Sequence, residues 1–371
     1  MKKFLVIFFI FFSFFNEAFA VEEIKLETEE SKLNYLSDVY YGKIEDANPI
    51  LKLFSKEGLK FKNSPINSVK ATFLYEGQLQ FLKNDHQGLS VKHDFSVIEP
   101  MISTRFNNNK SVAMFDINLV RNLKSKGYTN SFTQKISQVY IAHDFNENQR
   151  ILIGQGSRIP SSYNGSRSTM QQEFVLKSQA GRTFGDARAV GVRNIGKYKY
   201  IDYDFGLYDS TRYMKDFGHG IDFTGQIIFK PLANISEKSG DIKIGSSYSI
   251  GEYRNSYNQY SLFIGYDWHK IHLKTEYANA DGYNAIVYSR DNADGFYTTV
   301  SYDITPKLTI LARYDFFDPN KNISDNSSRE YTAGITYNIY KNMKIMLNLV
   351  RRDYDNKTDS NMILFATRFI L

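Results

Sequence analysis

Six basic side chains lie in one stretch of the chain that has no regular period. Residues 157–193 carry Arg158, Arg167, Lys177, Arg182, Arg188 and Arg193 against two acids, a local net charge of +4. Arginine presents planar pairs of N–H donors that match phosphate or carboxylate, and basic rings in pores favour anions. These six residues are therefore the predicted anion-binding set. The alternative is that the charges only keep the stretch hydrated or bind lipopolysaccharide.

The basic stretch is too long for an ordinary hairpin connection. The apolar run 151–153 precedes it, Val190 and Val192 follow it, and about thirty residues between them show neither helical nor strand periodicity. Loops of this length in compact domains are usually functional or disordered. The many apolar and aromatic residues argue against disorder. We interpret the stretch as a loop folded into the mouth of a barrel, where it narrows a pore.

Further basic residues share one face of the predicted strands. By the alternation of side chains they point away from the lipid-facing residues; they are Lys70, Arg105, Arg193, Lys243, Lys274, Arg313 and Arg352. Near the bilayer midplane, Arg or Lys on the lipid face would cost roughly 2–4 kcal/mol, so these side chains must face a water-filled lumen. Asp116, Asp267, Glu276, Asp303 and Asp315 share that face. Arg105 and Arg313 are the predicted pore-wall partners of the loop.

Catalytic and metal-binding patterns are weak in this sequence. None of the six His lies in an H-E-x-x-H arrangement, and no G-x-S-x-G elbow occurs. His269 and His272 flank a tight turn, where a hydrated turn is favoured over a metal pair. The absence of Cys excludes disulfides and thiolate metal sites. We predict no enzyme, no catalytic residue, no metal site and no cofactor.

The residues beyond Ser68 alternate with a period of two. Tyr260, Leu262 and Ile264 alternate with Ser261, Phe263 and Gly265, and comparable alternation gives sixteen stretches from 68–82 to 361–371. Such repeated alternation is typical of a transmembrane barrel. The fold class predicted is all-β: an antiparallel transmembrane β-barrel of about sixteen strands, with its third external loop folded inward.

Three regions are expected along the chain. Residues 1–20 have two Lys, an apolar core and a small-x-small end at Ala18-Phe19-Ala20, which is typical of a cleaved signal peptide. Residues 21–65, with seven Lys and nine acids, are predicted to form a periplasmic extension made of a short helix and linker, or a disordered terminus. Residues 66–371 are predicted to form the barrel domain.

The connections and strand ends agree with an outer-membrane barrel. Short connections alternate with longer polar ones, near 83–90, 123–132, 157–186, 211–219, 253–257, 281–292, 318–328 and 355–360, as periplasmic turns and external loops would. Tyr and Phe cluster at strand ends, where interfacial girdles are expected. Ile363, Phe365, Thr367, Phe369 and Leu371 fall on one face of the last strand, which resembles the strand that the barrel-insertion machinery recognises.

From about Phe95 onward the chain also resembles a known family. The resemblance lies in QVYIAHDFNENQRILIGQGSRIPSSYNGSR, GRTFGDARAVGV, LARYDFFDPN and YTAGITYNIYKNMKIMLNLVRRDY. In this order the segments are similar to the phosphate-selective porin family, the O/P type, of Gram-negative outer membranes. The resemblance implies a sixteen-stranded homotrimeric barrel with an inward third loop. Members include phosphate channels and channels for other solutes.

The expected function is a passive, water-filled channel in the cell outer membrane that prefers phosphate or other small anions. The alternatives are a general non-selective porin and a non-conducting structural or adhesion barrel. Expected partners are small anionic solutes, outer-membrane lipid and lipopolysaccharide, and the insertion machinery. Nucleic acid is not expected, because the signal peptide directs the chain out of the cytoplasm, despite a pI near 9.0.

Overall fold

The computed structural model describes nine segments of the chain. They are residues 52–84, 88–119, 136–156, 162–184, 188–212, 220–233, 239–253, 255–282 and 292–371. The predicted signal peptide, most of the predicted N-terminal extension and Arg158 lie outside these segments, so what was predicted for them stays a prediction.

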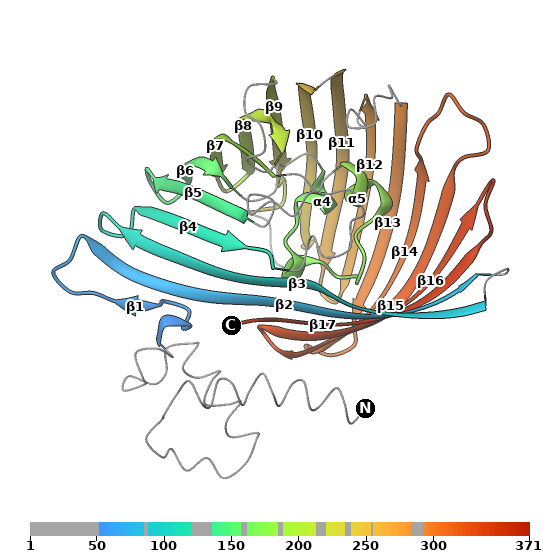
Figure 1. The fold of residues 1–371 in the computed structure, drawn as a ribbon, viewed down its shortest axis with the longest axis horizontal. Coiled ribbons are helices and arrows are strands. Elements are labelled where there is room, and N and C mark those ends of the chain that lie inside the picture. The colour runs from blue at the N-terminus through green and yellow to red at the C-terminus, as the bar shows by residue number, and fades with distance from the viewer. Residues whose placement is uncertain are drawn as a thin grey trace, which may run out of the picture.

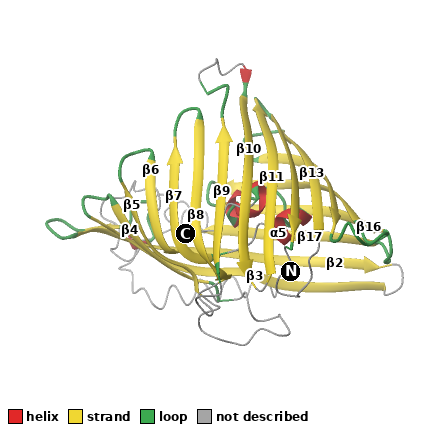
Figure 2. Ribbon diagram, turned by 90° about the horizontal axis from the view of Figure 1, so that it is seen from above, coloured by secondary structure: helices red, strands yellow, loops and turns green. Residues whose placement is uncertain are grey.

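Seventeen described strands form one antiparallel sheet, and sixteen of them, β2 to β17, close into a ring (Figures 1 and 2). Each ring strand pairs with its neighbours in sequence, and β17 pairs with β2 to close the circle. The strands are β1 (Leu59–Lys60), β2 (Ile66–Asn84), β3 (Gly88–Phe106), β4 (Ser111–Ile117), β5 (Ile136–Asp144), β6 (Gln149–Gln155), β7 (Ala189–Lys197), β8 (Ile201–Arg212), β9 (Ile221–Phe229), β10 (Asp241–Tyr253), β11 (Asn255–Trp268), β12 (Ile271–Asp281), β13 (Asn292–Asp303), β14 (Leu308–Asp318), β15 (Ser328–Tyr340), β16 (Met343–Tyr354) and β17 (Ser360–Ile370). The predicted sixteen-stranded barrel is confirmed.

The observed strands follow the predicted ones closely, with two informative differences. Residues 83–90 and 253–257 were expected to be external loops, but β2 reaches Asn84, β3 begins at Gly88, β10 reaches Tyr253 and β11 begins at Asn255. These strand ends are polar and lack alternation. Backbone pairing continues there beyond the alternating residues, so periodicity gives no sign of the extra strand length.

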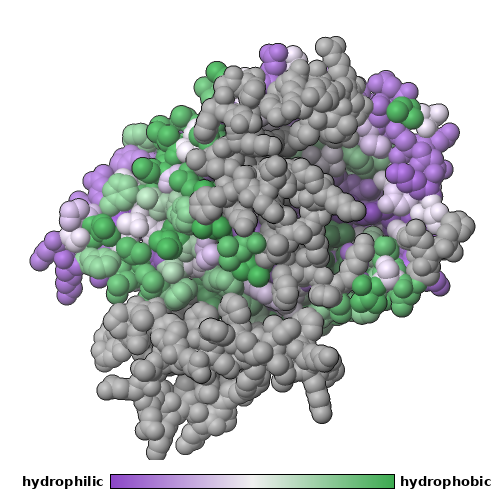
Figure 3. All heavy atoms as spheres, viewed as in Figure 1, coloured by the Kyte–Doolittle hydropathy of each residue, from purple (hydrophilic) through white to green (hydrophobic). Residues whose placement is uncertain are grey.

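The outward face of the ring is apolar. Ile102, Ile153 and Leu262 keep between 51% and 59% of their surface exposed. Figure 3 shows apolar residues gathered over the lower left of the visible wall and hydrophilic residues toward its left and right edges. Apolar side chains on that scale suit contact with lipid. No helix among the described residues is long and apolar enough to cross a membrane.

The inward face buries charged side chains that the sequence had placed there by parity. Arg313 is 4% exposed, Glu276 2% and Asp315 0%, and Glu330 and Arg368 are equally hidden. Charges in a water-filled barrel would be exposed, so another element must cover them. That element is the connection between β6 and β7.

The described end of the N-terminal region is tied to the barrel. Strand β1 pairs with the start of β2, with Leu59 opposite Val69. Gly58 has φ +75°, and a Cβ there would come within 2.5 Å of the Val69 carbonyl oxygen, so glycine permits this close turn. The barrel thus receives one short strand from before residue 66.

Candidate functional site: the inward loop and its seat on the barrel wall

Residues 162–184, the main described part of the connection between Gln155 and Ala189, lie inside the ring (Figure 1). They contain α4 (Tyr163–Ser166), the 3-10 turn η2 (Thr169–Gln171) and α5 (Gln179–Phe184). Ser162 caps α4 by accepting from the Gly165 N–H at 3.2 Å. No helical period is visible in the sequence because helices of three to six residues are too short to show one.

Glu276 on β12 holds the start of this inward loop. Its two carboxylate oxygens accept from the Tyr163 N–H at 2.8 Å and the Asn164 N–H at 3.0 Å. The Tyr163 ring stacks on Phe263 of β11, with centroids 4.2 Å apart. The first turn of α4 thereby gains a buried anion at its free N–H groups, which is a favourable charge-assisted contact.

Arg368 on β17 and Lys344 on β16 hold the middle of the loop through its backbone carbonyls. Arg368 donates to the oxygens of Thr169, Gln172 and Val175 at 2.9–3.3 Å, and it forms an ion pair with Glu76 on β2. Lys344 donates to the oxygens of Met170 at 2.8 Å and Gln172 at 2.5 Å. The buried wall cations therefore supply donors to the carbonyl oxygens of the loop, including those of Met170 and Gln172.

Glu330 on β15 is the centre of the third attachment. It accepts from Arg182 of α5 at 2.6 Å and from Arg352 at 2.6 Å, and Arg313 lies 3.8 Å away. Asp315 accepts from the Gln179 N–H at 2.8 Å, where α5 begins. Arg182 is thus used to hold the loop to the wall.

Apolar contacts complete the seat of the loop. Val175 packs in a cluster with wall residues of β16 and β17, namely Met346, Val350, Met362, Leu364 and Ala366. Ala180 and Phe184 of α5 pack on Ala278, Ala280 and Ala293. A Cβ on Gly295 would lie 2.8 Å from the Ala180 Cβ, so small wall residues let the helix approach closely.

A small polar hollow remains between the loop and the wall of β12–β14. Four cations and one carboxylate are among its lining residues: Arg167, Lys177, Lys274, Arg313 and Glu173. Lys177 donates to the Gly165 carbonyl oxygen at 2.7 Å, Lys274 pairs with Glu173, and Arg313 donates to the Leu176 oxygen at 3.0 Å. Arg167 lies over the Tyr163 ring, 5.5 Å from its centroid. The hollow, named here the cationic hollow, carries a net excess of positive charge.

The structure separates the predicted anion-binding residues into groups. Arg167, Lys177 and Arg313 meet at the cationic hollow, whereas Arg182 lies in the attachment at Glu330. Arg188 is 3.8 Å from both Glu99 and Asp116, and Arg193 pairs with Asp204. Arg105 is exposed and donates to the Asn109 oxygen at 3.3 Å.

Several anchoring residues were missed or given no role by the sequence analysis. Glu330, Arg368, Lys344 and Asn348 were not singled out, although Asn348 accepts from the Val175 N–H at 2.7 Å. Glu276 was recognised only as part of a mixed wall. The available signal was their inward parity: a charge within an alternating strand needs either water or a partner.

Comparison with known proteins agrees with the fold. Residues 228–357 match the family model described as Gram-negative porin. No curated protein matches the chain in sequence at a significant level. The phosphate-selective type stays a prediction, because the matching model is described without a solute.

Three solved outer-membrane structures illustrate the likeness. A loop L8 deletion mutant of OmpT from Vibrio cholerae has TM-score 0.60 and 10% identity, covering 82% of this chain and 99% of that one. An anion-selective porin from Comamonas acidovorans has TM-score 0.57 and 10% identity, covering 82% and 99%. The channel DcaP of Acinetobacter baumannii has TM-score 0.56 and 12% identity, covering 85% and 100%. At these identities the likeness concerns the fold.

The family match over residues 228–357 and the sixteen-stranded barrel agree with the prediction of a Gram-negative outer-membrane porin. They place the protein in the outer membrane and indicate a channel, not an enzyme. Anion preference and the natural solute do not follow from them.

Proposed function

We propose that this outer-membrane barrel of the Gram-negative porin type is a passive diffusion channel that prefers small anions. The observation that carries the proposal is the cationic hollow, where loop and wall bring Arg167, Lys177, Lys274 and Arg313 together against Glu173. A site with an excess of one sign of charge between low-dielectric walls concentrates the opposite ion. The fold is also shared with a porin that is described as anion-selective.

The predicted basic residues contribute unequally in this proposal. Arg182 and Arg193 each have a carboxylate partner, at 2.6 Å in both cases, and Arg188 lies between two carboxylates. Paired charges produce weak fields at a distance. The preference for anions is assigned mainly to Arg167 and Lys177, which line the cationic hollow from the loop. Lys274, which pairs with Glu173, and Arg313, which lies 3.5 Å from Asp315, are weaker wall partners. Arg105 and the undescribed Arg158 are secondary sites.

Ion selectivity in a planar bilayer tests this assignment. Replacing Arg167 and Lys177 together by Met keeps much of the side-chain volume but removes both charges. We expect the anion-to-cation permeability ratio to fall about fivefold or more, because a unit charge at 4 Å contributes about 1 kcal/mol even in bulk water and about 4 kcal/mol at an effective dielectric near 20. Block by added phosphate should weaken as well.

A matched control replaces two wall cations that have their own carboxylates. Arg150 pairs with Asp144 at 2.5 Å and Lys243 with Asp241 at 2.7 Å. The double variant Arg150→Met and Lys243→Met should change the ratio less than the loop variant does. If the reversal potential of the loop variant equals that of the unmodified protein, the channel is a general non-selective pore.

One observation favours the non-conducting alternative. Glu276, Glu330 and Arg368 attach the inward loop at three places, so a permanently seated loop could block the lumen as a plug. Discrete conductance steps from folded protein would reject this alternative. Three coupled steps would support the homotrimer expected from the family resemblance. In this proposal the mature protein lacks residues 1–20, and most of residues 21–65 lie in the periplasm.

A further inference from the structure

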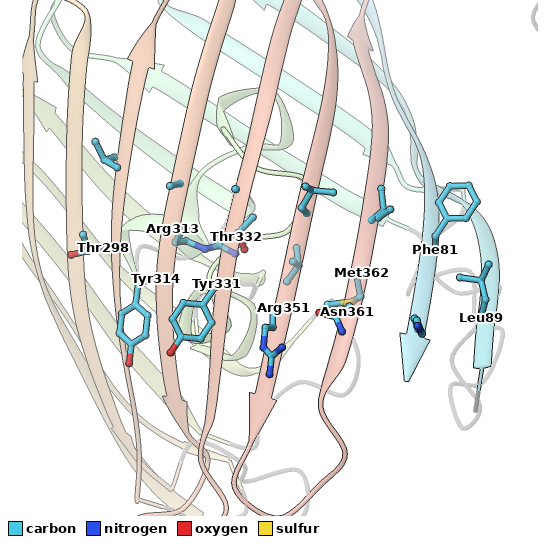
Figure 4. Close-up of a pocket in the computed structure, with 17 residues that line it drawn as sticks. Phe81, Leu89, Thr298, Arg313, Tyr314, Tyr331, Thr332, Arg351, Asn361 and Met362 are labelled. Atoms are coloured by element: carbon cyan, nitrogen blue, oxygen red, sulfur yellow. The ribbon is translucent and has the colours of Figure 1, made fainter. Parts of the chain in front are cut away.

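The outer wall of the barrel has a broad hollow across β13–β17 and β2, away from the lumen. Its volume is about 740 Å³ (Figure 4). It is named here the outer groove and is defined by its outward lining residues Phe81, Lys83, Leu89, Thr298, Val300, Ala312, Tyr314, Tyr331, Ala333, Leu349, Arg351, Asn361 and Ile363. Nothing in the channel proposal uses this surface.

Strand register orders the outer groove into two parallel rows. In one row, consecutive partners across six strands are Phe81, Ile363, Leu349, Ala333, Ala312 and Val300, all apolar. In the other, two residues nearer the external loops, they are Lys83, Asn361, Arg351, Tyr331, Tyr314 and Thr298. The lining of the groove therefore changes from apolar to polar and cationic within two residues along the strands.

The side chains of the apolar row are smallest at its centre. Ala312 and Ala333 are exposed and directly opposite each other, and larger side chains flank them: Leu349, 53% exposed, and Val300, 43% exposed. Figure 4 shows Tyr314 and Tyr331 side by side, and the strand register places them two residues from the paired alanines. A floor of two alanines between larger apolar side chains forms a channel-shaped depression suited to hydrocarbon chains.

The polar row offers donors at the level where lipid headgroups would lie. Lys83 is exposed and has no carboxylate within 4 Å among the described residues. Arg351 is 56% exposed and lies 2.7 Å from Asp353 and 3.3 Å from Asp359. These two acids reduce the local positive charge. The row itself nevertheless contains two cations, one amide, two tyrosine hydroxyls and no acid.

We propose that the outer groove binds an outer-leaflet lipid that carries both phosphate and acyl chains. The phosphate would lie against Lys83 and Arg351, and the hydrocarbon would lie on Ala312, Ala333 and Leu349. This order of headgroup and chains follows from the two rows if the longer connections face outside. A second copy of the chain is less suited, because it would have to supply an acid opposite Lys83 and an apolar ridge beside it.

Native mass spectrometry of the detergent-solubilised full barrel tests the headgroup contact. The probes are a phosphorylated, acylated glucosamine disaccharide (lipid A) and phosphatidylethanolamine. A basic residue near an anionic lipid contributes about fivefold in affinity. Allowing for the acids beside Arg351, Lys83→Ala with Arg351→Ala should lower lipid A affinity about tenfold and leave phosphatidylethanolamine binding unchanged. Lys110→Ala, in the β3–β4 turn, is the control.

Filling the floor tests the hydrocarbon contact. Ala333→Phe should displace lipid A without altering the headgroup cations, whereas Ala113→Phe, on the outer face of β4, should not. Equal lipid A affinity in the unmodified protein and the Lys83, Arg351 double variant would overturn the proposal. A change of oligomer mass in Ala333→Phe with unchanged lipid binding would instead assign the groove to a second copy. Heat-modifiable migration confirms folding, and channel selectivity is unaffected by either outcome.

Discussion

The inward loop is attached strongly at α5 and weakly where it rejoins the wall. At α5, Glu330 accepts from Arg182, and it also accepts from Arg352 of the wall, both at 2.6 Å. At the exit, Arg188 reaches Glu99 and Asp116 only at 3.8 Å, and its Nε and Nη1 have no hydrogen-bond partner among the described residues. Both sites are buried, and both combine acids with arginine.

The difference teaches what makes a buried ion pair stabilising. Removing charges from water is costly, and attraction offsets that cost only with good geometry and further hydrogen bonds. The site at Glu330 meets this condition at Oε1, which accepts from two guanidinium groups, whereas its Oε2 has no hydrogen-bond partner among the described residues. At the exit the carboxylates instead accept from neutral groups: Glu99 from Asn118 at 2.9 Å and Asp116 from Gln138 at 2.8 Å. Arg188 there balances charge more than it fastens the loop.

The largest effect should follow removal of the central acid. Glu330→Ala leaves Arg182, Arg313 and Arg352 without their shared carboxylate. We expect a loss of about 3–5 kcal/mol, as for other buried pairs that lose one partner. Urea unfolding of the protein in lipid vesicles, followed by heat-modifiable migration, measures this loss.

Glu330→Gln is the matched control, because it keeps the side-chain shape and one acceptor oxygen. It should be destabilised less than Glu330→Ala. Loss of the loop attachment should also increase current noise in single channels. Equal stability of Glu330→Ala and the unmodified barrel would show that Asp315 alone balances the three arginines.

A smaller effect is expected when the exit arginine is removed. Arg188→Ala should cost about 1–2 kcal/mol, because Glu99 and Asp116 keep their hydrogen bonds to Asn118 and Gln138. The same urea titration measures it. A loss as large as that of Glu330→Ala would contradict the distinction between the two sites and make the exit a second firm attachment.

The smallest effect should come from neutralising one acid at the exit. Asp116→Asn keeps one acceptor for the Gln138 amide, and it removes a carboxylate whose Oδ1 has no hydrogen-bond partner among the described residues. We expect a change of less than about 1 kcal/mol, in line with the net value of an ordinary hydrogen bond. A loss above 3 kcal/mol would mean that the ion pair at 3.8 Å is a main support of the fold.

The sequence predicted most of the barrel because the decisive signal is local. Alternation within each strand placed Lys274, Glu276 and Arg313 on the inward face, and Leu262 and Ile264 on the outward face. The structure agrees at each of these positions. The sequence also identified the β6–β7 connection as the element inside the barrel. Its short helices were missed, since Ser162 and the other caps act over only a few residues.

The roles of individual charges could not be predicted in the same way. Arg182 was assigned to anion binding, yet it holds the loop on Glu330, 148 residues later in the chain. Arg368 bonds to the Thr169 oxygen, 199 residues earlier, only because β17 closes on β2 and the loop crosses that wall. Nothing near either residue in the sequence marks its partner.

By itself, therefore, the sequence determined which side chains face lipid and which face the interior, because the pleat of a strand alternates every residue whatever lies around it. Only the tertiary structure decided which interior charges meet one another and which remain around the cationic hollow. Ring closure and the path of one loop set those distances, and the strength of a charge pair depends on distance, burial and hydrogen-bond geometry.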